Sequence, residues 1–177
     1  LGVGGLGISL AELAVGLREQ DLHRTVVTPR WRTDWPEQFQ FDGASVVRLA
    51  APTKSWWGQR AFNRRFAHWL KQNRDQIDLL AVSEDKHCGD VVAIGKRQGL
   101  PVVLLAEQRT PTLLPRTKRL LRTSLPLADV VVVSHQDHME AWRQAGYPVS
   151  HVREIALGVR PSSQDSRQKR QVRHALG

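Results

Sequence analysis

The chain has 177 residues, of which 41% are hydrophobic, so it is long enough to bury the core of one ordinary domain. Its single cysteine, Cys88, excludes an internal disulfide and suits a reducing compartment, and no apolar run approaches the roughly 18–20 residues that a bilayer-spanning helix needs. The formal net charge of +9 indicates an anionic partner rather than a cationic one.

The basic residues are concentrated in three stretches of the chain. Lys54–Arg74 contains six Lys/Arg and no acid, Arg109–Arg122 contains five and no acid, and Arg160–Arg173 contains five against Asp165. Such stretches favour binding to sugar nucleotides, anionic lipid surfaces or nucleic acid. A solvated basic surface explains any one of them equally well.

In chain order, a glycine-rich loop at the start is followed by strands that alternate with amphipathic helices. The predicted elements are helix Leu10–Gln20, strands Arg24–Thr28 and Ser45–Leu49, helix Arg60–Asn73, strand Asp78–Ser83, helix Lys86–Gln98, strands Pro101–Ala106 and Asp129–Ser134, helix Gln136–Ala145, and strand Val152–Ala156. This alternation predicts an α/β fold with a doubly wound, mostly parallel Rossmann-like sheet. A glycine loop normally follows a strand, so we expect that the first strand is missing and that the chain is a fragment.

The glycine-rich loop contains Gly4, Gly5, Leu6 and Gly7, directly before the first predicted helix. Residues without Cβ atoms let backbone N–H groups approach an anion, and the helix N-terminus adds partial positive charge. We therefore predict a phosphate or diphosphate site here, although a tight turn that binds nothing gives the same pattern. Gly2-x-Gly4-x-x-Gly7 also matches the dinucleotide fingerprint. The acid that this fingerprint expects for the ribose hydroxyl is missing, but Arg30 after strand Arg24–Thr28 suits the extra phosphate of NADP. An NADP-dependent oxidoreductase therefore stays open as an alternative, as does a non-enzymatic basic anion-binding module.

Charged side chains follow two of the predicted strands. They are Glu84, Asp85, Glu107 and Arg109. Because open α/β sheets bind ligands beyond the carboxyl ends of their strands, these residues are candidates for holding an acceptor substrate. The carboxylates would accept hydrogen bonds from hydroxyl groups and Arg109 would pair with a phosphate, whereas Asp85 serves equally well as a helix N-cap.

A tryptophan pair and a basic helix form a further candidate site. The residues are Trp56, Trp57, Arg60, Phe62, Arg64, Arg65, Phe66 and Trp69. Aromatic residues on one face with cations around them are typical of a helix that lies on an anionic membrane surface. Core packing explains the apolar face equally well.

The sequence does not predict a metal site, a catalytic triad or a nucleic-acid site. His135 and His138 lie three residues apart without a third ligand nearby, so we predict no metal site and no cofactor. No Ser/His/Asp arrangement is readable, and no side chain is predicted as the catalytic base. A motif that reads nucleic-acid sequence is also lacking, so we expect no specific nucleic acid partner.

The opening of the chain resembles the opening of family-4 glycosyltransferases, which have the GT-B fold. In that family a Gly-Gly loop precedes a helix with L-A-x-x-L and then a strand G-H-x-V-x-V. The matching residues here are Gly4-Gly5-Leu6-Gly7, Leu13-Ala14-x-x-Leu17, and His23 before Val26-Val27-Thr28.

Later segments resemble the family in the same order. They are Asp78–Val82 for D-V-V-H, Gly99–Val103 for G-x-P-V-V, Ala128–Ser134 for A-D-x-V-x-x-S, Ile155–Pro161 for I-P-N-G-V-D, and Arg173-x-x-Leu176-Gly177 for the start of the nucleotide-binding domain. The chain departs from the pattern in lacking the family's histidine after the fourth strand, where Glu107-Gln108-Arg109 stands.

The resemblance implies that residues 1–161 form the acceptor-side domain and that residues 162–177 connect to an absent C-terminal donor-binding domain. It implies a retaining, metal-independent hexosyltransferase whose loop Gly4–Gly7 contacts the donor diphosphate. The implied partners are a nucleotide-sugar and a glycan or lipid-linked acceptor, with an anionic membrane surface as a further candidate. We expect a cytoplasmic protein, peripheral on the inner face of the membrane if that surface is used, and inactive without the other domain.

Overall fold

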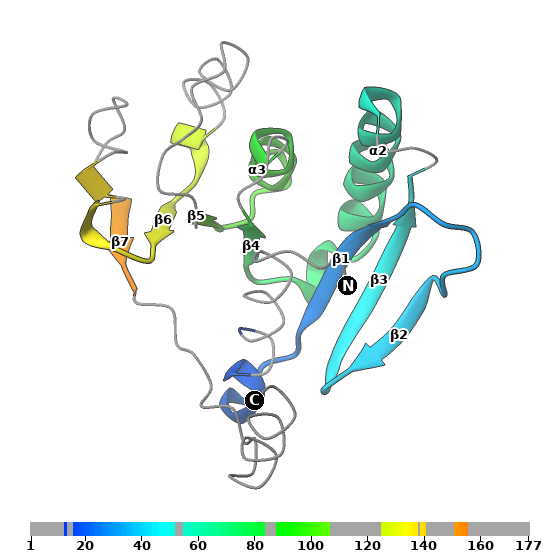
Figure 1. The fold of residues 1–177 in the computed structure, drawn as a ribbon, viewed down its shortest axis with the longest axis horizontal. Helices are drawn as coiled ribbons and strands as arrows, with labels where there is room; N and C mark the ends of the chain where they lie inside the picture. Colours follow the sequence, from blue (N-terminus) through cyan, green and yellow to red (C-terminus); the bar gives the residue numbers. More distant parts are fainter. Residues whose placement is uncertain are drawn as a thin grey trace, which may run out of the picture.

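The computed structural model describes residue 13 and residues 16–51, 55–83, 88–106, 125–137, 139–140 and 151–155. Strands and helices alternate along these ranges, as the sequence predicts (Figure 1). The elements are η1 (Leu17–Gln20), β1 (Thr25–Arg30), β2 (Gln38–Phe41), β3 (Ala44–Ala50), α2 (Trp56–Gln72), η2 (Arg74–Gln76), β4 (Leu80–Ser83), α3 (Cys88–Arg97), β5 (Val102–Ala106), η3 (Leu125–Leu127), β6 (Val130–Val133) and β7 (Val152–Glu154).

The strands form two hydrogen-bonded groups. One has the order β1-β3-β2 and the other the order β4-β5-β6-β7. Every pairing is parallel except the one between β2 and β3. The prediction of an α/β fold with a mostly parallel sheet is therefore confirmed, and each predicted strand that lies in the described residues is present to within a few residues.

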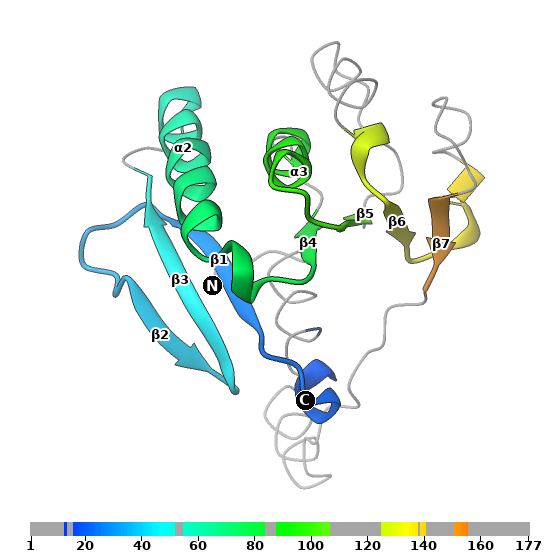
Figure 2. The ribbon, with the colours of Figure 1, turned by 180° about the vertical axis from the view of Figure 1, so that it is seen from behind.

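Helices α2 and α3 pack side by side on the same face of the strands (Figure 2). Phe62, Phe66 and Leu70 from α2 form one buried cluster together with Leu100. Leu80 and Val91 pack against this cluster and also against the core of the four-stranded group. The two groups of strands therefore share a continuous apolar layer beneath the helices.

The core of the four-stranded group follows the alternation of its strands. On β5, Val102, Leu104 and Ala106 are buried, whereas Val103 and Leu105 on the opposite face are only half-buried. Residues Val131 and Val133 of β6 continue the buried face. Because side chains alternate between faces, this buried row is the surface on which α3 rests.

Strand β2 was not predicted from the sequence. It pairs antiparallel with β3 through a tight turn at Asp42-Gly43, whose φ values are 48° and 77°. Positive φ at both central residues is the geometry of the type I′ hairpin turn, which favours Asp-Gly. The short alternating segment Gln38–Phe41 before the turn completes the hairpin.

The C-terminus of α3 is fixed by local sequence. Gly99 has a φ of 68°, its N–H donates to Lys96 O, and Leu100 N–H donates to Gly95 O at 3.2 Å. This pattern is a Schellman motif, which requires a left-handed residue and therefore favours glycine. The predicted end of this helix near Gly99 is confirmed.

Helix α3 approaches the sheet closely at Gly95. A Cβ atom at this position would lie 2.6 Å from Cδ2 of Leu80 and 3.1 Å from Cγ2 of Val102. A larger side chain would therefore push the helix away from β4 and β5.

Parts of two predicted helices lie outside the described residues. For Leu10–Gln20, the described positions 13 and 16 are helical and Leu17–Gln20 forms a 3-10 turn that ends at Asp21, with φ 51°. For Gln136–Ala145, the described positions 136–137 and 139–140 are helical. The described parts of both helices agree with the prediction.

Candidate functional site

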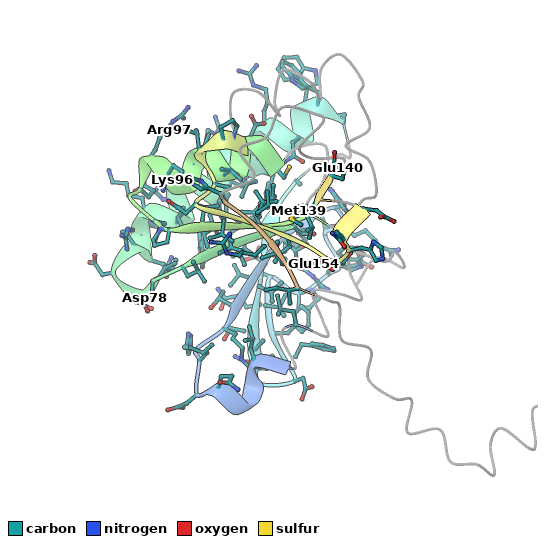
Figure 3. All side chains as sticks on the ribbon, turned by 90° about the vertical axis from the view of Figure 1, so that its left-hand side faces the viewer. Asp78, Lys96, Arg97, Met139, Glu140 and Glu154 are labelled. Carbon is teal, nitrogen blue, oxygen red and sulfur yellow. The ribbon has the colours of Figure 1, made fainter. Side chains whose placement is uncertain are left out.

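The parallel strands end at one edge of the four-stranded group, which we call the carboxyl edge. The pairings Ala106↔Val133 and Val133↔Glu154 bring three strand ends together, and Ser83 pairs one residue earlier, with Leu105. Figure 3 shows Met139, Glu140 and Glu154 at this end of the molecule, opposite Asp78, Lys96 and Arg97. The carboxyl edge is where open α/β sheets bind their ligands.

The acceptor-side candidates follow this edge in the chain. Glu84 and Asp85 come directly after Ser83, and Glu107 and Arg109 come after Ala106. All four lie outside the described residues, so their roles stay predictions. The same is true of the glycine loop, Gly4, Gly5, Leu6 and Gly7.

Two polar groups at the carboxyl edge were missed by sequence reasoning. Ser83 Oγ is buried, and no described residue forms a hydrogen bond with it. Glu154 is exposed at the end of β7. A hydroxyl and a carboxylate at strand ends suit the binding of polar ligand groups. The sequence signal for Ser83 was its position at the end of the predicted strand Asp78–Ser83, whereas Glu154 lies inside the predicted strand Val152–Ala156 and carried no such signal.

Helix α2 carries the candidate residues that the structure describes. It begins at Trp56, one turn earlier than predicted, because the Ser55 side chain caps its first turn by accepting a 3.5 Å hydrogen bond from Gly58 N–H. Trp56 and Trp57 are therefore part of the helix rather than of the preceding loop. Since α2 starts after β3, this turn lies where β3 ends (Figure 1).

The aromatic residues predicted for a membrane surface are divided between the two faces of α2. Phe62 and Phe66 are only 8% and 3% exposed and stack on each other in the core, with ring centroids 6.0 Å apart. Trp69 is half-buried and packs against the same cluster. Assigning Phe62 and Phe66 to a membrane surface was therefore wrong, because packing against β3 and α3 buries them in the core. Trp69 keeps part of its surface exposed.

The tryptophan pair and the cations of α2 lie outside the core. Trp56 and Trp57 are 55% and 70% exposed, and their rings meet edge-on with centroids 4.5 Å apart. The Arg60 guanidinium lies 4.6 Å from the centroid of the Trp56 ring, which is a cation–π contact. Arg64 and Arg65 are also exposed, although Arg65 donates a 2.7 Å hydrogen bond to Ala50 O at the end of β3.

A shallow hollow of about 490 Å³ lies between α2 and β3. Leu49 and Trp69 supply half-buried apolar surface, and the remaining lining is polar or basic and exposed. The full set of lining residues is Leu49, Arg64, Arg65, His68, Trp69 and Gln72. The hollow combines an apolar wall with cations, which suits an amphipathic anion.

The opposite edge of the sheet carries structural ion pairing. Lys96 Nζ lies 2.8 Å from both carboxylate oxygens of Asp129, and Val102 N–H donates to the same carboxylate at 2.7 Å. These hydrogen bonds, first the one from Lys96 and then the one from Val102, hold the pKa of Asp129 below its ordinary value. The pair connects α3 to β5 and β6 and is far from the carboxyl edge (Figure 3).

Among the described residues, no helix is long and apolar enough to cross a bilayer. Within the same ranges, no three His, Cys, Asp or Glu side chains are grouped closely enough to hold a metal ion.

Comparisons with known proteins identify what the chain is similar to. The model for Glycosyltransferase Family 4 matches residues 3–163. No match is found among curated proteins. Among solved structures, HepE of Anabaena in complex with UDP and glucose is similar over 98% of this chain, with a TM-score of 0.65 and 17% identity.

Two further HepE structures are similar to the chain. HepE with UDP-glucose matches over 97% of the chain, with a TM-score of 0.61 and 15% identity. HepE with UDP matches over 97%, with a TM-score of 0.59 and 16% identity. In each case the chain covers 47% of HepE, so it spans about half the length of these solved relatives.

Proposed function

The chain belongs to glycosyltransferase family 4, and we propose that it is the acceptor-side half of a GT-B enzyme that transfers a sugar from a nucleotide-sugar to an acceptor. The observation that carries this proposal is the family match over residues 3–163, on a fold that resembles half of a GT-B enzyme. In this proposal residues 1–161 form the acceptor-side domain, and residues 162–177 lead to a donor-binding domain.

The donor is a nucleotide-sugar, whose diphosphate contacts the backbone of Gly4, Gly5, Leu6 and Gly7. HepE was solved with UDP and with UDP-glucose, which supports a donor of this class for a related fold. Backbone N–H groups aimed at the diphosphate would stabilise the negative charge that develops on the leaving group. This step needs no metal ion and no side-chain base from the loop.

The acceptor lies at the carboxyl edge. Glu84 and Asp85 after β4, with Glu107 and Arg109 after β5, accept hydrogen bonds from acceptor hydroxyls and pair with an acceptor phosphate. Parallel pairing of β4 with β5 supports this, since both strands end at the same edge. The transferred sugar is a hexose and its anomeric configuration is retained, which NMR of the product tests directly.

The experiment measures transfer by the purified protein that carries this chain. A panel of labelled nucleotide-sugars is offered with glycan and lipid-linked acceptors, and Gly5→Val is compared with the wild type. We expect Gly5→Val to lower kcat about 100-fold, because a side chain prevents close approach of the backbone to the diphosphate.

Gly16→Ala is the matched glycine control. Gly16 has a φ of −61°, and an added Cβ would meet nothing within 4 Å, so the substitution should leave transfer unchanged. Consumption of NADPH with a carbonyl substrate, without any sugar transfer, would overturn the proposal in favour of an oxidoreductase. Equal loss of transfer in Gly16→Ala would remove the assigned role of the loop.

A further inference from the structure

The exposed face of α2 presents one continuous row of side chains. Trp57, Arg60, Arg64, His68 and Lys71 recur at intervals of three or four residues and are all exposed. Residues at this spacing share one side of a helix. We call this row the outer stripe of α2; the buried residues Phe62, Phe66 and Leu70 occupy the other side.

The positive charge of the outer stripe is not neutralised locally. Helix α2 contains no Asp or Glu, and Arg64 and Lys71 form no ion pair or side-chain hydrogen bond with any described residue. By contrast, Arg65 from the same helix is engaged with Ala50 O, and Arg74 just after it donates to backbone oxygens. Cations that serve no internal contact are available to an external anion.

The tryptophan end of the stripe exposes more apolar surface than folding requires. Tryptophan is on average a well-buried residue, yet Trp56 and Trp57 are both more than half exposed. Arg60 stacks on the ring of Trp56, so an apolar surface and a cation are presented together. Indole rings next to basic groups favour the boundary between lipid headgroups and acyl chains.

We propose that the outer stripe of α2, together with Trp56, lies on an anionic lipid bilayer with the helix axis parallel to the surface. The 17 residues of α2 present a face about 25 Å long, with the tryptophans inserted at one end and the cations against lipid phosphates. The hollow beside Arg64 and Trp69 offers an apolar wall next to the cations, which suits a lipid headgroup and the start of its acyl chain.

A bilayer held against α2 would also keep a lipid-linked acceptor within reach of this half of the enzyme. This last step rests on the proposed function, whereas binding to the bilayer does not.

The experiment is co-sedimentation of the purified protein that carries this chain with vesicles. One set is pure phosphatidylcholine, and the other contains about 30% phosphatidylglycerol, both in about 0.1 M salt. We expect binding only to the anionic vesicles, with a loss on the order of 100-fold in the triple variant Arg60→Gln/Arg64→Gln/Lys71→Gln. Trp57→Ala should weaken binding about 10-fold, since one indole no longer inserts.

A single-charge pair provides the matched control. Arg64→Gln and Arg97→Gln remove the same charge from exposed helix positions, but Arg97 lies on α3. We expect about fivefold weaker binding for Arg64→Gln and no change for Arg97→Gln. Circular dichroism of each variant establishes that the fold is intact, which the exposure of these residues leads us to expect.

Three outcomes would overturn the inference. Equal loss in Arg64→Gln and Arg97→Gln would show that net charge alone drives binding. Equal binding to both kinds of vesicle would remove the electrostatic contribution. Tighter binding of the stripe to single-stranded DNA than to anionic vesicles, with the same dependence on the variants, would assign it to a nucleic acid. Vesicle binding without sugar transfer would still support the inference and count only against the proposed function.

Discussion

Helices α2 and α3 lie side by side on the same face of the strands, yet their polar residues differ in whether they contact the rest of the protein. In α3, Lys96 pairs with Asp129, and the C-terminal backbone is held by the Schellman turn and by Arg74. In α2, one face is buried as deeply as α3 is, while the other carries Arg64 and Lys71, which form no ion pair or side-chain hydrogen bond with any described residue. Two helices with similar amphipathic sequences can therefore differ in whether their outer face serves the fold or an external ligand.

The largest expected loss of stability comes from a substitution on the buried face of α2. Phe66→Ala should lower the free energy of unfolding by about 3–4 kcal/mol, because it leaves a cavity between Phe62 and Trp69 in the core. Trp57→Ala, on the outer face, should change it by less than about 0.5 kcal/mol. Urea unfolding of both variants measures the difference, and a comparable loss in Trp57→Ala would mean that the outer face is structural after all.

A smaller effect concerns the connection between the two helices. Arg74 Nε donates to Gln98 O at 2.7 Å, and the same guanidinium donates to Ile77 O and Gly99 O. Arg74→Ala should lower the free energy of unfolding by about 2 kcal/mol, because these carbonyls lose a charged donor. The control is Arg97→Ala, which removes an exposed arginine of α3 and should be nearly neutral in thermal unfolding. Similar shifts in Tm for the two variants would contradict a bridging role for Arg74.

The smallest expected effect depends on pH and concerns the ion pair between Asp129 and Lys96, which lies in the last turn of α3. The pKa of Asp129 is lowered in the folded protein, so its contribution to stability is present above the unfolded pKa of about 3.9 and is lost as the pH falls through the folded value. Asp129→Asn should cost about 1 kcal/mol at neutral pH, because the side chain is 46% exposed and solvent screens the pair.

Urea unfolding at neutral pH and below about pH 3 checks this prediction. The difference between wild type and Asp129→Asn should shrink in acid, since the wild-type carboxylate is then protonated. Lys96→Met serves as the partner control and should remove most of the same difference. A gap between wild type and Asp129→Asn that is equal at both pH values would show that the pair does not supply the stability.

The sequence predicts the strands well because their apolar runs are short and bounded by turn residues. The hydrogen bonds at Gly99 explain why the end of α3 could also be predicted, since a left-handed glycine stops a helix locally. Strand β2 was missed even though Asp42-Gly43 after an alternating segment is a strong hairpin pattern. The sequence therefore contained the information needed to predict this strand.

The division of the α2 residues could not be predicted in the same way. Phe62 and Trp57 are both aromatic residues of one helix, and only the packing of β3 and α3 decides which is buried. The same holds for Arg65 and Arg74, whose partners, Ala50 and Gln98, are far away in the chain. Contacts between distant segments depend on the fold as a whole, so a basic stretch read alone cannot separate structural cations from available ones.

The Asp42-Gly43 hairpin has a consequence for the order in which the described strands assemble. A two-residue turn closes at little entropic cost, whereas every parallel pairing among the described strands requires a long crossover before its first hydrogen bond forms. The β2–β3 pair is therefore the contact that can form earliest, with β1 and α2 adding to it. Folding of this region would begin at the outer strand β2 and progress inward through β3 to β1.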